Sequence, residues 1–214
     1  QAGIPRSEFF ITTKIPPEDL RYDAIIAACE RYLRELQTDY VDLLLIHWPN
    51  EKFDMRRMMR ALGHLVDAGR TRNVGVSNFT RRLIDQAIVD CPVALATNQV
   101  EFHPFLQQPL LLEHCRSKGI ILTAYCPLAK GRVQDSSVIQ EIARQHAKLP
   151  AHVALRWLLQ KGLAAVPKSS REEHLIANLR VFEFELTAEE LKRIDSIKSH
   201  PRIVDNLPGT QFDE

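Results

Sequence analysis

The feature that most constrains this chain is an alternation of short apolar segments with amphipathic segments, which runs through the whole sequence. The clearest apolar segment is "VDLLLI" (41–46), which leads directly into His47, Trp48 and Pro49. Nearly continuous apolar runs of this length are typical of parallel strands that are covered on both faces. The strands predicted in this way cover residues 9–14, 41–48, 73–78, 95–100, 120–126 and 162–167.

Amphipathic segments with helical spacing lie between these strands. Gly69 marks the end of one predicted helix, because glycine readily adopts the left-handed conformation found there, and Thr80 is the predicted N-cap of another. Alternating strands and helices predict a parallel α/β domain, either a doubly wound sheet or a (β/α)8 barrel. Apolar stripes cover 25–36, 58–66 and 83–88, and further helices are predicted at 107–118, 136–147, 151–160, 171–180 and 188–198.

Two observations favour the barrel over the doubly wound sheet. The chain has no GxGxxG motif, which a dinucleotide-binding doubly wound sheet carries after its first strand. In addition, each predicted strand has a polar residue at or just beyond its C-terminal end, and the carboxyl ends of barrel strands form the rim where barrel enzymes do their chemistry. These rim residues are Lys14, His47, Ser77 with Asn78, Gln99, Tyr125 and Lys168.

Composition and charge exclude several other classes of protein. The 214 residues carry a net charge of +1 with basic and acidic residues interspersed, so neither nucleic acid nor a membrane surface is a predicted partner. No apolar run reaches the roughly 18 residues that a membrane span needs. Four widely spaced cysteines predict reduced thiols in a cytoplasmic protein, with no metal site. No exposed apolar stripe stands out, so a monomer is expected.

The segment "VPKSSREEHLIANL" (166–179) predicts a phosphate site. Ser170 and Glu173 have the spacing of a capping box that opens a helix. Lys168 and Arg171 add positive charge at that helix start, where backbone N–H groups point toward the rim. A helix N-terminus after the last barrel strand is the usual phosphate site of this architecture.

Six stretches occur in an order that resembles the aldo-keto reductase family. They are "ITTK", "TDYVDLLLIHWP", "GRTRNVGVSNF", "TNQVEFHP", "AYCPLAKG" and "VPKSSREEHLIANL". The resemblance covers essentially the whole chain. The stretch "AYCPL" and the tail "HPRIVDNLPGTQFDE" are most similar to the bacterial 2,5-diketo-D-gluconate reductase branch.

The resemblance implies an oxidoreductase that reduces an aldehyde or ketone, such as a keto-sugar acid or a small reactive aldehyde, with NADPH in a (β/α)8 barrel. Lys14 corresponds to the family's catalytic lysine and His47 to its catalytic histidine, while Trp48 belongs to the substrate wall. Elementary chemistry agrees, because hydride addition builds negative charge on the carbonyl oxygen and needs hydrogen-bond donors and an acid. A lysine ammonium beside a tyrosine lowers the pKa of the phenol and makes it a better acid.

The resemblance also implies a set of cofactor contacts. Tyr125 stacks on the nicotinamide ring, and Asn178 reaches the adenine. The nicotinamide carboxamide is bound by Ser77, Asn78 and Gln99, the diphosphate loop contains Cys126, Pro127 and Leu128, and Lys168 and Ser169 hold the 2′-phosphate. Ser170 and His174 are further predicted contacts of the cofactor.

Three departures from the family pattern matter. The family's catalytic tyrosine and its aspartate precede "ITTK", so residues 1–214 are expected to be one barrel domain without its first two β/α units. Tyr22 and Tyr40 lie in or beside helices and do not replace the tyrosine. His174 stands where relatives often have arginine, which grips phosphate better than a neutral imidazole. The segment after His47 is short, which predicts an open pocket that tolerates polar substrates.

Two other functions are weighed against the reductase. The first is a non-catalytic protein that binds the nicotinamide cofactor and senses redox state, like the ion-channel accessory proteins of the family. The second is a metal-dependent barrel hydrolase, which requires an HxH pair and further metal ligands at the strand ends. "EFHP" together with His47 is too sparse for such a metal site.

Overall fold

The computed structural model of the chain describes residues 3–198, 201–204 and 212. The chain divides into two compact units, and the boundary falls inside strand β4 (Leu95–Glu101). The first unit contains the residues up to Asn98 together with Ser117–Ile120 and Phe212. The second unit contains Gln99–Arg116 and most of the chain from Ile121 onward.

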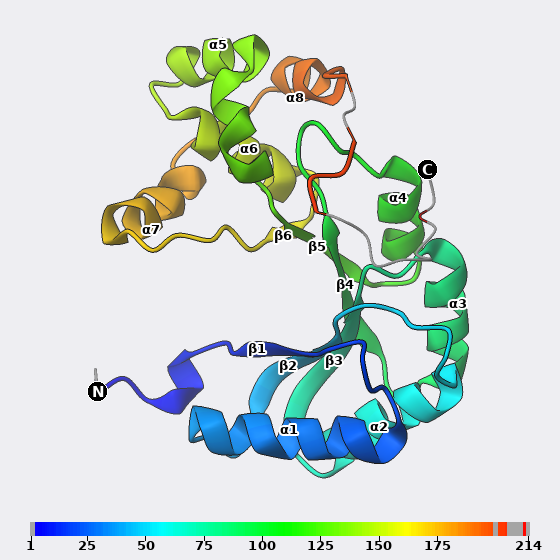
Figure 1. Ribbon diagram of the computed structural model, residues 1–214. Coiled ribbons are helices and arrows are strands. Elements are labelled where there is room, and N and C mark those ends of the chain that lie inside the picture. Colours follow the sequence, from blue (N-terminus) through cyan, green and yellow to red (C-terminus); the bar gives the residue numbers. More distant parts are fainter. Residues whose placement is uncertain (1–2, 199–200, 205–211, 213–214) are drawn as a thin grey trace. The chain divides into compact units, whose positions relative to one another are not determined.

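The first unit is a parallel sheet with its helices following the strands in order. Its elements are the 3-10 turn η1 (Arg6–Glu8), β1 (Thr12–Ile15), α1 (Tyr22–Leu36), β2 (Val41–Ile46), α2 (Met55–Asp67), β3 (Thr71–Ser77), α3 (Arg81–Asp90) and the start of β4. The strands lie in chain order, and β2 pairs in parallel with both β1 and β3. In Figure 1, α1 and α2 lie side by side against one face of these strands.

The second unit continues the same alternation. It contains the end of β4, α4 (Pro109–Ser117), β5 (Ile121–Tyr125), the 3-10 segment η2 (Ala129–Asp135), α5 (Ser137–Gln145), α6 (Pro150–Gln160), β6 (Ala164–Ala165), α7 (Glu172–Leu179), η3 (Arg180–Phe182) and α8 (Ala188–Asp195). Strand β5 pairs in parallel with β6, with Thr123 opposite Ala164. The α/β class predicted from the sequence is therefore confirmed.

Local sequence explains most element boundaries. Thr80 caps α3 by accepting a hydrogen bond from the Leu83 N–H, as predicted, and Gly69 follows α2 with a positive φ of 68°. The least accurate strand prediction is 162–167, where only Ala164 and Ala165 pair with β5. Pro167 offers no N–H to a ladder and Gly162 turns with φ 78°, so the strand is short.

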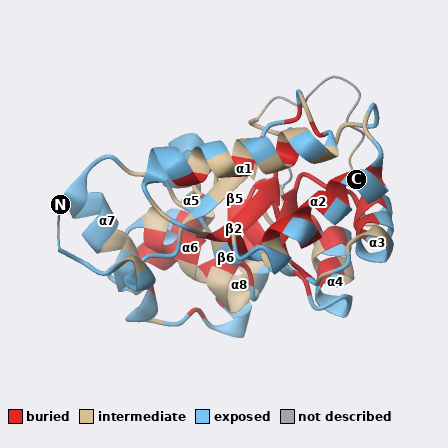
Figure 2. Cartoon of the chain, turned by 90° about the horizontal axis from the view of Figure 1, so that it is seen from below, coloured by how far each residue is buried: buried red, intermediate tan, exposed pale blue. Residues whose placement is uncertain are grey.

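Strand β2 is the most buried strand of the first unit. All six of its residues are buried, and Figure 2 shows it in red. The run nevertheless contains a carboxylate, Asp42, which is only 3% exposed. That carboxylate accepts hydrogen bonds from the Ile11 N–H at 2.9 Å, from Arg6 at 2.7 Å and from Arg72 at 3.2 Å. The buried charge is thus paired on several sides, as a buried carboxylate requires.

Asp42 gives a test of stability against pH. Burial alone would raise its pKa, but the hydrogen bonds from Ile11 and Arg6 and the two guanidinium charges outweigh burial and lower the pKa below the ordinary value. A lowered carboxyl pKa stabilises the fold above the unfolded-state pKa, and that contribution disappears as pH falls through the folded-state pKa. Asp42→Asn should therefore flatten the fall in unfolding free energy below about pH 4, measured by urea titration. The exposed Asp67→Asn is the control, and an unchanged acid limb in Asp42→Asn would contradict the prediction.

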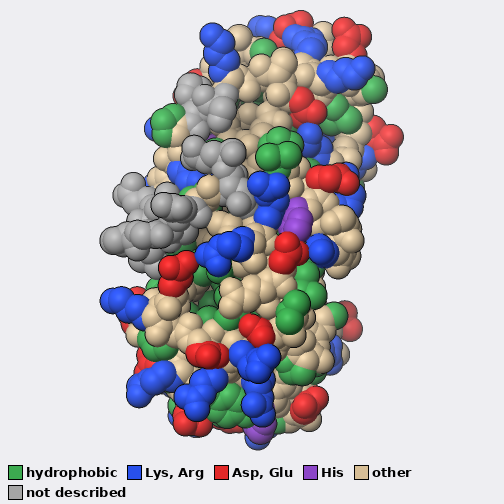
Figure 3. Space-filling view, turned by 90° about the vertical axis from the view of Figure 1, so that its right-hand side faces the viewer, with side chains coloured by type: hydrophobic (Ala, Val, Ile, Leu, Met, Phe, Trp, Pro, Cys, Tyr) green, Lys and Arg blue, Asp and Glu red, His purple; other side chains and the backbone are tan. Residues whose placement is uncertain are grey.

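Side chains of both charge signs lie interspersed on the face of the molecule that Figure 3 presents. The expectation of no exposed apolar stripe is wrong for α7, however, because Leu175, Ile176 and Leu179 are 49%, 55% and 69% exposed, and Phe182 in η3 is 69% exposed. Within the described residues no helix is long and apolar enough to cross a membrane.

Candidate active site

The predicted site residues fall into two groups, one in each unit. In the first unit, Lys14 lies beside Leu45 in the ladder, and the His47 N–H donates to the Ile15 carbonyl at 2.9 Å. Paired residues of parallel strands share a face and side chains alternate along a strand, so Lys14 and His47 point to the same side of the sheet. Ser77 extends the same row, because Ile46 pairs with Val76 one position earlier. The structure therefore brings Lys14, His47 and Ser77 together.

The electrostatics of this group suit an uncharged histidine. Burial, and after it the nearby Lys14 ammonium, lower the pKa of His47 below the ordinary value. Burial also lowers the pKa of Lys14. A lowered histidine pKa keeps the imidazole neutral near pH 7, so that it can donate a hydrogen bond to a carbonyl oxygen without adding a second positive charge beside Lys14.

Asn78 fixes the ends of two strands. It adopts a left-handed conformation with φ 62°, and its Nδ2 donates to the His47 carbonyl and to Ser77 Oγ, each at 3.1 Å. Ser77 and Asn78 are each 1% exposed. The Asn78 amide thus holds the residue that follows β2 against the end of β3. A contact of these side chains with the carboxamide stays a prediction.

Trp48 follows His47 and is only 8% exposed. Its indole packs edge-on against the Phe212 ring, with ring centroids 6.3 Å apart and planes at 72°. An edge-to-face aromatic pair fixes both rings in orientation. Sequence reasoning missed Phe212, although the tail "GTQFDE" carries one conspicuous aromatic residue.

In the second unit, Tyr125 is the last residue of β5 and is half-buried. Burial, followed by the charge of Glu101, raises the pKa of Tyr125 well above its ordinary value. A raised pKa makes this phenol a weaker acid, so Tyr125 is poorly suited to donate a proton. Gln99 is 4% exposed and lies two residues before the end of β4, not at the end as predicted.

A tight turn follows Tyr125. The Ala129 N–H donates to the Cys126 carbonyl at 2.9 Å, and the Gly131 N–H donates to the Leu128 carbonyl at 2.8 Å. Cys126 and Ala129 have positive φ values of 53° and 50°. Pro127 is buried within this turn. The predicted diphosphate loop is thus a structured turn held by its own backbone.

The predicted capping box at α7 is wrong. Arg171 occupies the N-cap position, and among the described residues no side chain caps this helix. Ser169 Oγ accepts the Arg171 N–H at 3.1 Å, and Glu173 forms an ion pair with the Arg171 guanidinium. A turn at Ser169 and the ion pair with Arg171 have taken the place of the Ser170–Glu173 exchange. The first-turn N–H groups of α7 thus lack a capping side chain, which is the condition that anion binding requires.

The side chains predicted for the 2′-phosphate lie on the open surface around this helix start. Lys168 is three residues beyond β6 and is exposed, as are Ser170 and His174, whereas Ser169 is half-buried. Asn178, near the end of α7, is half-buried. An exposed cation and an uncapped helix start fit a phosphate group.

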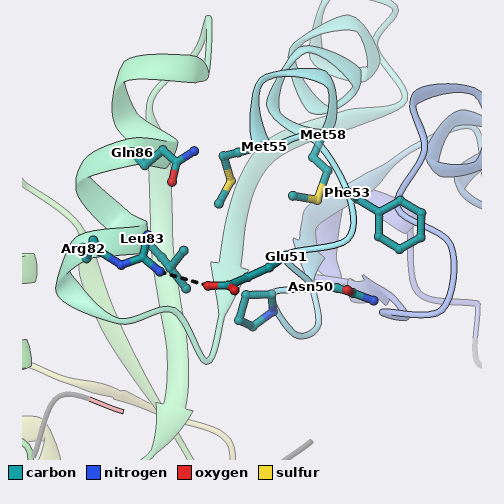
Figure 4. A pocket seen from close by; sticks show the side chains of 9 residues that line it. Asn50, Glu51, Phe53, Met55, Met58, Arg82, Leu83 and Gln86 are labelled. Atoms are coloured by element: carbon teal, nitrogen blue, oxygen red, sulfur yellow. Dashed lines mark hydrogen bonds and ion pairs between the residues drawn. The ribbon is translucent and has the colours of Figure 1, made fainter. Parts of the chain in front are cut away.

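A separate pocket of about 220 Å³ lies near the end of β2 in the first unit. Figure 4 shows Met55 and Met58 of α2 facing Leu83 and Gln86 of α3, with an ion pair from Arg82 to Glu51 at 3.1 Å. It is also lined by Pro49, Asn50 and Phe53, and none of the predicted site residues lines it. The structure therefore keeps this pocket apart from the Lys14–His47 group.

Cys29, Cys91, Cys115 and Cys126 form no disulfide with one another, and burial raises the pKa of the Cys126 thiol. Over residues 3–198, 201–204 and 212, no group of three or more His, Cys, Asp or Glu residues could hold a metal ion.

Comparison with known proteins identifies the family. The model of the Aldo/keto reductase family matches residues 2–199. Glyoxal reductase of Bacillus subtilis is 41% identical over 206 residues, which cover 96% of this chain and 74% of that protein. Methylglyoxal reductase DkgB of Escherichia coli O157:H7 is 39% identical over 95% of this chain and 78% of its own length.

A solved structure assigned as a 2,5-diketo-D-gluconic acid reductase B has a TM-score of 0.95 and 39% identity, over 100% of this chain and 77% of that one. The parallel α/β architecture and this likeness fit the predicted (β/α)8 class. The relatives are named as reductases, which supports the predicted carbonyl reduction and not the accessory-protein alternative. The chain belongs to the aldo/keto reductase family of oxidoreductases.

Proposed function

We propose that this protein reduces small, polar aldehydes or ketones with NADPH. The proposal depends mainly on one observation: Lys14 and His47 lie on the same sheet face, near the carboxyl ends of adjacent strands. The chain that carries them belongs to this family. The relatives named for glyoxal, methylglyoxal and diketogluconic acid all act on compact carbonyl compounds. We therefore expect a dicarbonyl or keto-sugar acid among the substrates.

The chemistry assigns separate tasks to the residues of the first unit. Bound NADPH supplies the hydride that forms the new C–H bond at the carbonyl carbon, and the carbonyl oxygen takes up a proton. Neutral His47 donates a hydrogen bond that orients this oxygen, while the Lys14 ammonium stabilises the charge that develops near it. Trp48, held by Phe212, forms one wall for the substrate.

The second unit would hold the cofactor. The Tyr125 ring would stack on the nicotinamide, and Gln99 would bind its carboxamide, a role also proposed for Ser77 and Asn78 of the first unit. The turn through Cys126, Pro127 and Leu128 lies along the diphosphate. The exposed surface at α7 then receives the 2′-phosphate and the adenine through Lys168, Ser169, Ser170, His174 and Asn178.

The proton donor is proposed to be a tyrosine that pairs with an aspartate in other β/α units of the same barrel domain. The exposed apolar side chains around α7 support this proposal, because a surface of that kind needs a cover. The absence of disulfides among the four cysteines supports a cytoplasmic location. We expect a monomer once the apolar side chains of α7 are covered, and light scattering of the whole gene product would test this.

The decisive experiment is a cofactor-oxidation assay on the whole gene product. Glyoxal, methylglyoxal and 2,5-diketogluconate are offered with NADPH, and the alcohol products are identified by mass spectrometry. Formation of one alcohol per NADPH oxidised is the expected result. Cofactor binding without oxidation by any of these carbonyl compounds would contradict the reductase and favour the accessory protein.

Lys168→Ala should weaken NADPH binding more than NADH binding. The ammonium would make a charge-assisted contact with the 2′-phosphate, so its loss should cost about 1–3 kcal/mol for NADPH and much less for NADH. Dissociation constants from fluorescence titration measure both. Lys198→Ala provides an exposed lysine as the control. An equal loss of affinity for NADPH and NADH would show that Lys168 does not contact the 2′-phosphate.

A further inference from the structure

The Glu101 carboxylate is a buried acceptor that the reductase chemistry does not use. It ends β4, is 0% exposed and lies 3.1 Å from the Nε2 of the equally buried His103. It also accepts two backbone N–H groups from a distant segment, that of Ile203 at 2.7 Å and that of Val204 at 3.1 Å. A buried carboxylate that accepts backbone N–H groups makes strong, charge-assisted hydrogen bonds.

Two further contacts hold the same short segment. Gln108, whose Nε2 donates to the Glu101 carbonyl at 2.7 Å, accepts a hydrogen bond from Arg202 at 3.1 Å. On the other side, Lys130 Nζ donates to the Ile203 carbonyl at 3.3 Å. We name the set formed by Glu101, Gln108 and Lys130, acting on residues 202–204, the C-terminal clasp.

The clasp is built from the elements that carry the predicted nicotinamide and diphosphate contacts. Glu101 lies two residues after Gln99 on β4, and the charges of Glu101 and Arg202 both act on the Tyr125 phenol. Lys130 belongs to the turn that begins at Cys126, and its backbone lies against the Cys126 thiol. Any shift of the clasp would therefore be transmitted to the stacking ring and to the diphosphate turn.

We propose that Glu101 is a positioning residue which, by holding the backbone of residues 203–204, sets the geometry of the Tyr125 ring and of the turn through Lys130 for cofactor binding. This inference rests on the proposed function for its link to the cofactor. The clasp itself does not depend on that function. A hydrogen bond to a charged group contributes more than one between neutral groups. Removal of the Glu101 charge should therefore release residues 203–204 locally, without unfolding the rest of the protein.

The first experiment tests the clasp without any cofactor. Glu101→Gln keeps the size of the side chain but removes the charge and places an NH2 donor opposite one of the two backbone N–H donors. Hydrogen exchange of the whole protein should then accelerate about tenfold to a hundredfold at the Ile203 and Val204 amides. Glu113→Gln, on the exposed surface of α4, is the matched control and should leave both amides unchanged. Unchanged exchange in Glu101→Gln would overturn the clasp.

A second variant guards against a general loss of folding. Val204→Pro removes one donor N–H from the half-exposed segment and leaves Glu101 and its strand intact. The Ile203 amide should again exchange about tenfold faster, with the melting temperature of the whole protein unchanged. Protection of Ile203 that persists in this variant would also overturn the clasp.

The third measurement tests the link to the cofactor. In Glu101→Gln and Val204→Pro, the dissociation constant for NADPH should rise about tenfold, while Glu113→Gln binds as the wild type does. Faster exchange with unchanged NADPH affinity would overturn the positioning role. If the wild-type protein binds neither NADPH nor NADH, the proposed function fails, and the exchange measurements still decide whether the clasp exists.

Discussion

Replacing Lys14 with methionine should lower turnover by about a hundredfold or more, with little change in NADPH affinity. The expected size is that of losing a group that acts on proton transfer at the reacting oxygen. Methionine keeps most of the length of the side chain and removes the charge. The ammonium lies close enough to His47 to lower the pKa of the imidazole, so its loss changes the electrostatics of the site directly.

The measurement is steady-state kinetics with a dicarbonyl substrate, together with a cofactor titration of the same variant. Lys52→Met, an exposed lysine in the loop before α2, controls for a general effect of replacing lysine by methionine. The pKa of His47 should also rise in Lys14→Met, because one cause of its depression is removed, and proton NMR of the imidazole can follow this. Wild-type turnover in Lys14→Met would refute the catalytic assignment.

Trp157→Ala should lower the free energy of unfolding by about 3–5 kcal/mol, the usual cost of emptying a large aromatic site in a core. Trp157 of α6 is 0% exposed, and its ring lies 5.8 Å from that of Phe102. Its indole N–H donates to Asp195 of α8 at 2.8 Å, so the side chain joins two helices and the end of β4.

Trp157→Phe separates packing from the hydrogen bond. Asp195 keeps a partner in this variant, because Lys161 also contacts its carboxylate at 2.8 Å. We therefore expect a smaller loss of about 1–2 kcal/mol. Urea titrations followed by far-UV circular dichroism measure both variants. Equal losses in the two variants would mean that ring packing is not the main contribution of Trp157.

Local sequence was sufficient to predict the class of fold and the shared sheet face of Lys14, His47 and Ser77. The continuous apolar run in β2, the glycine after α2 and the threonine before α3 each act on their immediate neighbours, so their effects can be predicted from spacing alone. In parallel strands the carboxyl ends face one edge. The sequence therefore also predicted that Lys14, His47 and Ser77 would share a location.

The capping of α7 could not be predicted from spacing, because several side chains near its start can make alternative hydrogen bonds and ion pairs. Ser169 and Ser170 are adjacent hydroxyls, and either could have fixed the helix start. The Arg171–Glu173 ion pair removed the partner that Ser170 needed. The exposure of the α7 side chains could not be predicted from the sequence either, because this helix has as many apolar residues as a buried helix would.

Contacts between residues far apart in the chain were decided only by the tertiary structure. Asp42 is the one charged residue in an otherwise apolar run, and ion pairs with Arg6 and Arg72 compensate its burial. The Glu101 carboxylate accepts hydrogen bonds from backbone N–H groups about a hundred residues further along the chain. The Trp48 ring packs against Phe212, which is also distant in sequence. The spacing of apolar residues along a helix or strand determines which of its faces is apolar. The partner of a buried charge depends on which distant segments the tertiary structure brings next to it.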